Sequence, residues 1–167
     1  RIYTFTPDSQ QLIYGSNADS EFNQAMAYDL ADESHSVSYT ADWDVSFTYF
    51  SKDGQYRVTG INQDAQTVLD IVNTKTGEAL KIPNLPAGDL RGVNFSDDSS
   101  TLVFYLNSDT SPSNLYTYTP GHDTAKRLTN TGNPDINEDH LVSGEVRRFK
   151  SFDGLEIPGI LYKPKQA

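Results

Sequence analysis

Three histidines, His35, His122 and His140, are the residues of this chain best suited to general-base catalysis or metal binding. A histidine metal site usually shows a paired spacing such as His-x-x-x-His, and the sequence contains none. The chain also has no cysteine, which excludes thiolate nucleophiles and thiolate zinc ligands. We therefore expect the histidines to be structural or surface residues, and we expect no catalytic residue, metal or cofactor in this chain.

Asp135, Asn137 and Asp139 alternate as oxygen ligands do at the start of a calcium loop. A loop of the EF-hand type continues with glycine at its sixth position and glutamate at its twelfth. The sequence has His140 and Val146 at these positions. We interpret the three side chains as part of a polar connecting segment.

Asp8, Asp53 and Asp98 would be candidates for acid–base chemistry, but they recur at a constant interval of 45 residues. A catalytic pair occurs once in a fold, whereas an aspartate that forms a turn can occur once in every repeat. Aspartate and serine can hydrogen-bond to their own backbone in a turn, and Gly54 can adopt a positive φ. These four residues are therefore predicted to be structural turn residues.

The turns belong to a longer repeat. Each copy has a strand that ends at phenylalanine, a polar turn centred on aspartate, and a second apolar strand. The three copies are Phe5–Tyr14, Phe50–Thr59 and Phe95–Phe104. A third and a fourth strand are predicted after each copy, at 25–30 and 35–40, at 67–72 and 79–82, and at 115–118 and 125–129.

Four short antiparallel strands per repeat are typical of a propeller blade. The predicted fold class is therefore all-β: a partial β-propeller of three four-stranded antiparallel blades with a C-terminal β-hairpin. The blades are expected at about 1–43, 44–89 and 90–131. A sandwich or barrel with strands at regular intervals is the alternative fold, and the repeat favours the propeller.

Aromatic and apolar strand residues are expected to pack between the blades. The run 102–106 is continuously apolar apart from the hydroxyl group of its tyrosine. Such a run is typical of a strand that is covered on both faces. Tyr105, Tyr116 and Tyr118 could line a channel or contact peptides, but packing is the commoner role. Asn94-Phe95-Ser96 matches the glycosylation pattern, and its place on a strand makes coincidence the better interpretation.

Three blades are fewer than the roughly 4 to 8 with which propellers close. Two blade faces should therefore lack a neighbour. We expect the remaining blades to lie upstream in a longer parent protein, and we expect this chain by itself to self-associate through the uncovered faces.

The net charge of −10 gives no basic surface for a phosphate backbone, so nucleic acid is not an expected partner. No apolar stretch approaches the roughly 20 residues that a membrane helix needs, so no membrane partner is expected either. The compartment stays open, because a chain without cysteine carries no redox signature.

The repeat stops after Thr131. Residues 132–144 are polar and rich in turn formers, which predicts a linker. Two apolar strands follow within residues 145–167, and Asp153-Gly154 between them is a strong hairpin signal.

The blade motif, the linker and the hairpin run 146–164 together resemble the junction between propeller and catalytic domain in the prolyl oligopeptidase family of serine peptidases. The acylaminoacyl-peptidase-like branch is the most similar. The resemblance implies that a propeller limits access of peptide substrates to an α/β-hydrolase domain, of which 145–167 would be the first hairpin and the remainder would follow in cis.

The family needs a serine on a nucleophile elbow and a later aspartate and histidine. No Gly-x-Ser-x-Gly occurs in this sequence, so no catalytic residue is transferred to it. The alternative function is a TolB-like propeller that acts as a protein-binding module.

Overall fold

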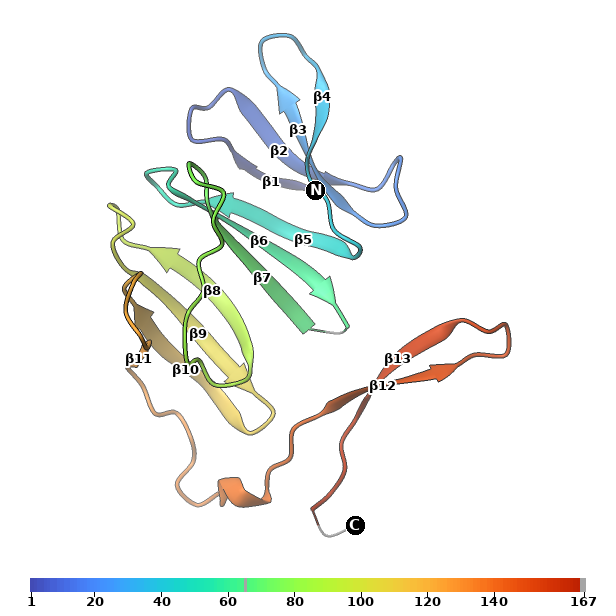
Figure 1. Ribbon diagram of the computed structural model, residues 1–167, viewed down its shortest axis with the longest axis vertical. Helices are drawn as coiled ribbons and strands as arrows, with labels where there is room; N and C mark the ends of the chain where they lie inside the picture. The colour runs from blue at the N-terminus through green and yellow to red at the C-terminus, as the bar shows by residue number, and fades with distance from the viewer. Residues whose placement is uncertain (65, 166–167) are drawn as a thin grey trace.

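The computed structural model describes residues 1–64 and 66–165, which form three antiparallel sheets and a separate hairpin. Figure 1 shows the three sheets arranged as a fan, with the hairpin standing apart from them. The only helix in the described part is the 3₁₀ helix η1, Glu138–His140, and no helix there is long enough to cross a membrane. The predicted all-β class and its propeller-type blades are confirmed.

The first blade is a four-stranded sheet in the order β1-β2-β3-β4. Its strands are β1 Ile2–Phe5, β2 Gln11–Ser16, β3 Gln24–Asp29 and β4 His35–Tyr39. Each strand pairs antiparallel with the next one in the sequence. This is the meander that the repeat predicts for one blade.

The second blade contains three strands, not four. They are β5 Asp44–Phe50, β6 Tyr56–Gln63 and β7 Gln66–Asn73. The predicted fourth strand at 79–82 is reduced to a single bridge between Val72 and Ala79. Pro83 and Pro86 follow directly, and proline cannot donate a hydrogen bond to a neighbouring strand, so the chain leaves the sheet here.

The third blade is again four-stranded, in the order β11-β10-β9-β8. Its strands are β8 Asp89–Phe95, β9 Leu102–Ser108, β10 Ser111–Tyr118 and β11 Lys126–Arg127. The last strand is shorter than the predicted 125–129. Side-chain bonds continue where β11 ends, because Thr129 Oγ1 accepts a hydrogen bond from the Leu115 amide at 2.8 Å.

Two apolar clusters join the blades. The smaller cluster lies between the first two blades and contains Ile13, Ala25, Ala27 and Val45. The larger cluster lies between the second and third blades, where Val58 and Ile71 meet residues of β8, β9 and β10. Burying apolar side chains contributes about 25 cal/mol per Å² removed from water, so these clusters hold neighbouring blades together.

Tyrosine hydroxyls link the first strands of successive blades. Tyr3 Oη on β1 donates to the Val45 carbonyl on β5 at 2.8 Å, and Tyr49 Oη on β5 donates to the Val93 carbonyl on β8 at 2.6 Å. Burial raises the pKa of Tyr49 to about 12. The same type of contact thus repeats at both blade boundaries.

The outer faces of the first and third blades are uncovered. On β9, Leu102, Phe104 and Leu106 are buried, but Val103 is 37% exposed and Tyr105 is 48% exposed. The prediction that this strand is covered on both faces is therefore wrong for this chain, because no blade packs against the second face among the described residues. On the first blade, Ile2 is 73% exposed.

The hairpin consists of β12 Glu145–Lys150 and β13 Glu156–Leu161, paired antiparallel from Glu145↔Leu161 to Lys150↔Glu156. The connection from β11 carries η1 and no strand. The division into blades, a linker at 132–144 and the start of a hydrolase domain at 145–167 stays a prediction.

Candidate functional site

The recurrent aspartates form one kind of turn three times. Oδ1 of Asp8, Asp53 and Asp98 accepts a hydrogen bond from a hydroxyl two residues earlier, at 2.6, 2.7 and 2.7 Å. The same oxygen accepts the amide two residues later at 3.1, 3.0 and 3.1 Å. These bonds fold the carboxylate back onto its own turn, as in an Asx turn.

The hydrogen bonds stabilise the ionised carboxylates. Hydrogen bonds from the Ser96 hydroxyl and from Ser100 lower the pKa of Asp98 to about 2. The pKa of Asp53 is lowered chiefly by the Ser99 hydroxyl, and that of Asp8 chiefly by the Thr6 hydroxyl. A general acid near neutral pH needs a raised pKa, so these groups are unsuited to that role.

The residue after each aspartate adopts a left-handed backbone. The φ values are 59° at Ser9, 72° at Gly54 and 54° at Ser99. A Cβ at Gly54 would lie 2.7 Å from Pro7 Cγ in the first blade, so glycine is needed there for close approach as well.

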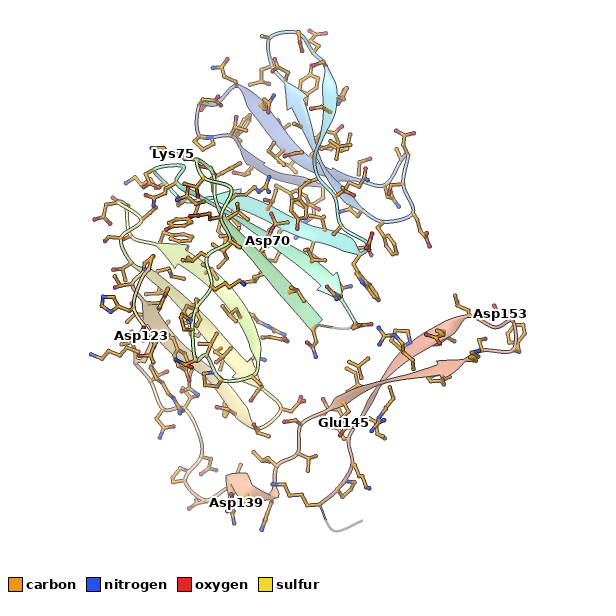
Figure 2. The ribbon with its side chains drawn as sticks, viewed as in Figure 1. Asp70, Lys75, Asp123, Asp139, Glu145 and Asp153 are labelled. Atoms are coloured by element: carbon orange, nitrogen blue, oxygen red, sulfur yellow. The ribbon has the colours of Figure 1, made fainter. Side chains whose placement is uncertain are left out.

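The hairpin contains a fourth turn of this kind. The Leu155 amide donates to Asp153 Oδ1 at 3.1 Å, and Gly154 has a φ of 86°. The strands end at Lys150 and resume at Glu156, so the loop has five residues and is not the two-residue Asp-Gly turn of the sequence signal. Figure 2 shows Asp153 at the hairpin tip, far from the propeller sheets.

The turns of neighbouring blades also contact one another. Ser99 Oγ of the third blade donates to Asp53 Oδ1 of the second at 2.5 Å. Beside this bond, Lys52 Nζ lies 2.6 Å from Asp97 Oδ2. The aspartate turns therefore position whole blades and not only their own strands.

The histidines lie in three unrelated settings. The His35 ring packs on Tyr28 with 4.9 Å between ring centroids, and its Nδ1 lies 2.9 Å from Tyr14 Oη. The His122 amide closes a turn onto the Thr119 carbonyl, and His140 ends η1. Among the described residues, no three His, Asp or Glu side chains are placed to hold a metal.

The residues of the calcium-like pattern take part in local turns, in which Asn133 and Asn137 supply the side-chain acceptors. Asn137 Oδ1 accepts the Asp139 amide at 2.9 Å, and Asn133 Oδ1 accepts the Asp135 amide at 3.0 Å. Figure 2 places Asp139 in the segment between the third blade and the hairpin. Asn94 lies near the end of β8, where its side-chain amide donates to the Gly92 carbonyl.

The three tyrosines divide into two groups. Tyr116 stacks on Phe104 at 5.7 Å between ring centroids, and Tyr118 Oη donates to the His122 carbonyl at 3.0 Å, so both pack inside the sheets. Tyr105 lies on the uncovered face of the third blade. The expectation that it packs between blades is wrong for this chain.

The base of the hairpin meets the propeller at a polar hollow of about 630 Å³. Asp109, in the turn after β9, accepts the Gly144 amide and the Tyr162 hydroxyl, each at 2.8 Å. The Gly144 amide is the main cause of the lowered pKa of Asp109, and Asp109 in turn raises the pKa of Tyr162. The hairpin is thus fixed to the third blade by one carboxylate.

A second contact fixes the hairpin to the second blade. Arg148 Nη2 lies 2.5 Å from Asp64 Oδ1 and 2.7 Å from Oδ2. Asp64 belongs to the turn after β6, so the hairpin bridges the ends of two blades. The sequence gives no signal for Asp64, Asp109, Arg148 or Tyr162, because each contact joins residues that are far apart in the chain.

The contacts described above position the blades and the hairpin. The carboxylates of Asp8, Asp53 and Asp98 accept turn hydrogen bonds, and those of Asp64 and Asp109 hold the hairpin. The chain presents the blades on one side and the exposed hairpin β12–β13 on the other. Phe152 at the hairpin tip is 103% exposed, so its apolar ring has no contact to shield it.

The fold is that of propellers in known proteins. A prolyl endopeptidase, solved in a study of inter-domain dynamics in catalysis and specificity, matches 95% of this chain with a TM-score of 0.70 and 14% identity. Prolyl oligopeptidase B from Galerina marginata matches 95% with a TM-score of 0.67 and 14% identity. TolB from Acinetobacter baumannii matches 100% with a TM-score of 0.56 and 19% identity.

The chain spans 23% of each of the two prolyl peptidases and 39% of TolB. No family model and no curated protein matches the sequence. At these identities the comparisons establish the propeller fold, as found in prolyl oligopeptidases and in TolB.

Proposed function

We propose that this chain is the non-catalytic propeller portion of a serine peptidase of the prolyl oligopeptidase type. In this role the blades restrict peptide access to a hydrolase domain, and β12–β13 begins that domain. The hydrolase domain acts in cis and supplies the nucleophile, the general base and the oxyanion hole. The more specific placement in the acylaminoacyl-peptidase-like branch rests on the hairpin residues alone.

The observation that carries the proposal is the better structural agreement of the chain with the two prolyl peptidases. They reach TM-scores of 0.70 and 0.67, against 0.56 for TolB, whose match covers the hairpin as well because it spans the whole chain. The exposed apolar side chains of the hairpin support it further. Phe149, Phe152 and Leu155 are all exposed, as expected of a hairpin that packs against a domain in the complete protein.

The second candidate function is a TolB-like module that binds a protein partner. The match to TolB over the whole chain favours it. The lower TM-score of TolB, 0.56 against 0.70 and 0.67 for the prolyl peptidases, makes it the second choice.

The coding sequence that follows Ala167 distinguishes the two functions. The peptidase proposal predicts a Gly-x-Ser-x-Gly elbow there, followed by an aspartate and a histidine. A reading frame that ends soon after the hairpin contradicts the peptidase proposal and favours the binding module.

Activity measurements provide the biochemical test. The chain by itself should hydrolyse neither fluorogenic peptides nor esters, and a serine-reactive phosphonate should leave its mass unchanged. A protein extended through the following domain should hydrolyse these substrates, and its mass should increase by that of the bound phosphonate. Hydrolysis by this chain alone, in a sample whose β circular dichroism shows it to be folded, would contradict the proposal.

A further inference from the structure

The outer edge of β7 is only half paired. The Asn73 amide donates to the Glu78 carbonyl at 2.9 Å, and the Leu80 amide donates to the Ile71 carbonyl at 2.7 Å. Backbone groups in a strand alternate between its two edges, so Leu69 and Thr67 turn their N–H and C=O groups to the same side. Within 1–64 and 66–165, no group is hydrogen-bonded to these two residues on that side.

The other blades cover the corresponding edge further. In the first blade, β4 pairs with β3 from Tyr28 as far as Ala25. In the third blade, the segment after β11 follows β10 as far as Leu115, whose carbonyl accepts the Leu128 amide at 2.7 Å. The second blade therefore lacks the part of a fourth strand that would pair with Leu69 and Thr67.

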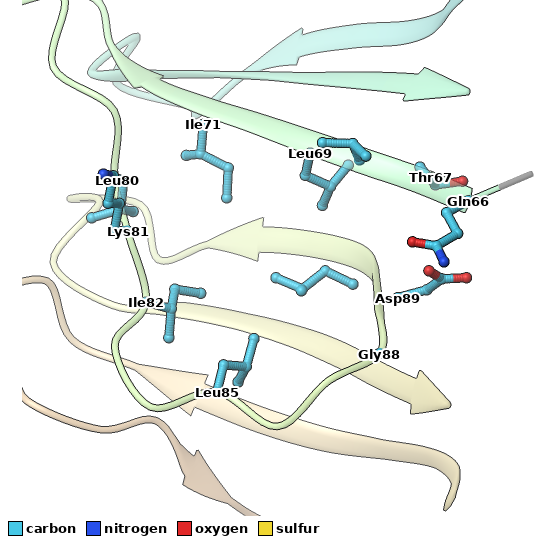
Figure 3. Close-up of a pocket in the computed structure, with 12 residues that line it drawn as sticks. Gln66, Thr67, Leu69, Ile71, Leu80, Lys81, Ile82, Leu85, Gly88 and Asp89 are labelled. Carbon is cyan, nitrogen blue, oxygen red and sulfur yellow. The ribbon is translucent and has the colours of Figure 1, made fainter. Parts of the chain in front are cut away.

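A crevice of about 380 Å³ lies beside this free edge. Figure 3 shows that it is bounded by β7 on one side and by the connection 80–88 on the other. The side chains that line it are mainly apolar and include Leu69, Ile71, Leu80, Ile82, Leu85 and Leu90. Five of these six are only partly buried, so the crevice offers apolar surface that the chain itself does not cover.

The polar groups of the crevice stand at its ends. Figure 3 shows Gln66 and Asp89 together at one end and Lys81 at the other. The middle is apolar, and its length follows β7. A ligand that fits has to be elongated, apolar on one side, and able to bond to a row of backbone groups.

We propose that this edge and crevice bind an extended peptide segment, which completes the missing fourth strand of the second blade. Its backbone pairs antiparallel with Thr67 and Leu69, continuing the direction of the Ala79 bridge. Its alternate side chains are apolar and enter the crevice. The segment is neutral or basic, because the chain carries a net charge of −10 and Asp89 stands at the crevice end.

This inference does not depend on the proposed peptidase role. Strand addition uses main-chain hydrogen bonds for affinity and alternate side-chain pockets for specificity. Both are present at β7. An apolar small molecule would use only the crevice, and this difference makes the proposal testable.

The probe is a capped peptide with six residues of alternating valine and threonine, followed by one lysine. Its binding to the whole chain is measured by calorimetry, and the site is located from amide shifts in nuclear magnetic resonance spectra. We expect shifts at residues 66–71 and 80–82. A peptide of the same sequence with N-methyl groups on its pairing edge should bind about tenfold more weakly, since it loses main-chain hydrogen bonds.

The matched variant is Thr67→Pro. It removes an N–H that points away from β6, so every hydrogen bond between β6 and β7 keeps its donor. It should weaken binding about tenfold, whereas Asp19→Ala in an exposed loop of the first blade should not change it. Leu69→Asn tests the crevice if the proline variant melts early. Equal binding of the N-methylated peptide, shifts confined to other blades, or occupation of β7 by a second copy of the chain would overturn the proposal.

Discussion

Asp53 Oδ1 accepts three hydrogen bonds, from the Ser51 hydroxyl, the Gln55 amide and the Ser99 hydroxyl of the next blade. An oxygen held in this way is fixed in orientation and stays ionised. Its lowered pKa is therefore a sign of structure. A perturbed carboxylate that recurs in every repeat is explained by its turn and needs no catalytic role.

Backbone conformation at the turns gives a paired prediction. Gly54→Ala should destabilise the fold by about 1 kcal/mol or more, because φ is positive and the new Cβ would contact Pro7. Ser9→Gly should stabilise it by up to about 1 kcal/mol, because the exposed Ser9 holds the same strained conformation. Urea unfolding measures both changes. Equal effects of the two substitutions would contradict this account of the turns.

The carboxylates also predict a dependence on acid. Asp98 has a pKa of about 2 in the folded chain, against an ordinary value of 3.8, because Ser96 and Ser100 donate to it. A lowered folded-state pKa means that the stabilisation is complete above about pH 4 and is lost as the pH falls toward 2. The side-chain carbon shift of Asp98 in an acid titration measures this pKa. A midpoint at the ordinary value would show that the turn bonds do not form.

At the scale of the elements, the sequence predicts correctly those strands and turns that depend on residues close together in the chain. The first two strands of each blade, their turns and the hairpin depend on alternation and on turn formers that lie within a few residues of each other. Pro83 and Pro86 limit the fourth strand of the second blade at its C-terminal end, but nothing in residues 79–82 themselves predicts that pairing is reduced to the bridge at Ala79.

Long-range features could not be predicted in this way. Arg148 and Asp64 are separated by 84 residues, and nothing in either local sequence selects the other. The run 102–106 has the same letters whether or not a further blade covers its second face. The sequence therefore predicts packing for Tyr105, although the surroundings of this side chain depend on whether a further blade is present.

The anchoring of the hairpin gives a prediction at this scale. Asp109→Ala removes the acceptor of the Gly144 amide and of the Tyr162 hydroxyl, so amide hydrogens of the hairpin should exchange faster. Exchange in β5 to β10 should stay the same, because those strands pair with each other. Asp19→Ala, at an exposed loop residue, is the matched control. Unchanged exchange in the hairpin of Asp109→Ala would show that the carboxylate is not its anchor.

At the scale of the whole molecule, the open fan has consequences for association. The outer face of the third blade exposes Val103 and Tyr105, and that of the first blade exposes Ile2. These are different faces of one chain, so contact between them joins copies head to tail. In the longer parent protein that we propose, further blades would occupy both faces.

We therefore expect the isolated chain to self-associate as its concentration rises. Tyr105→Lys should weaken association, because it places a charge in the apolar contact, while Thr76→Lys in an exposed turn should not. Sedimentation velocity over a wide range of concentrations is the measurement. A monomer at every concentration would contradict the expectation.

A repeated turn holds successive blades against each other, and a double-mutant cycle on Asp53 and Ser99 tests this role most directly. Asp53→Ala alone should cost about 0.5 to 2 kcal/mol by analogy with lost helix caps. Asp53→Ala and Ser99→Ala should couple by about 1 kcal/mol, which is less than a hydrogen bond to a buried charged group contributes, because this site is partly exposed. The exposed pair Lys52 and Asp97 should couple by less. Purely additive losses for Asp53 and Ser99 in urea unfolding would contradict the stacked-blade account.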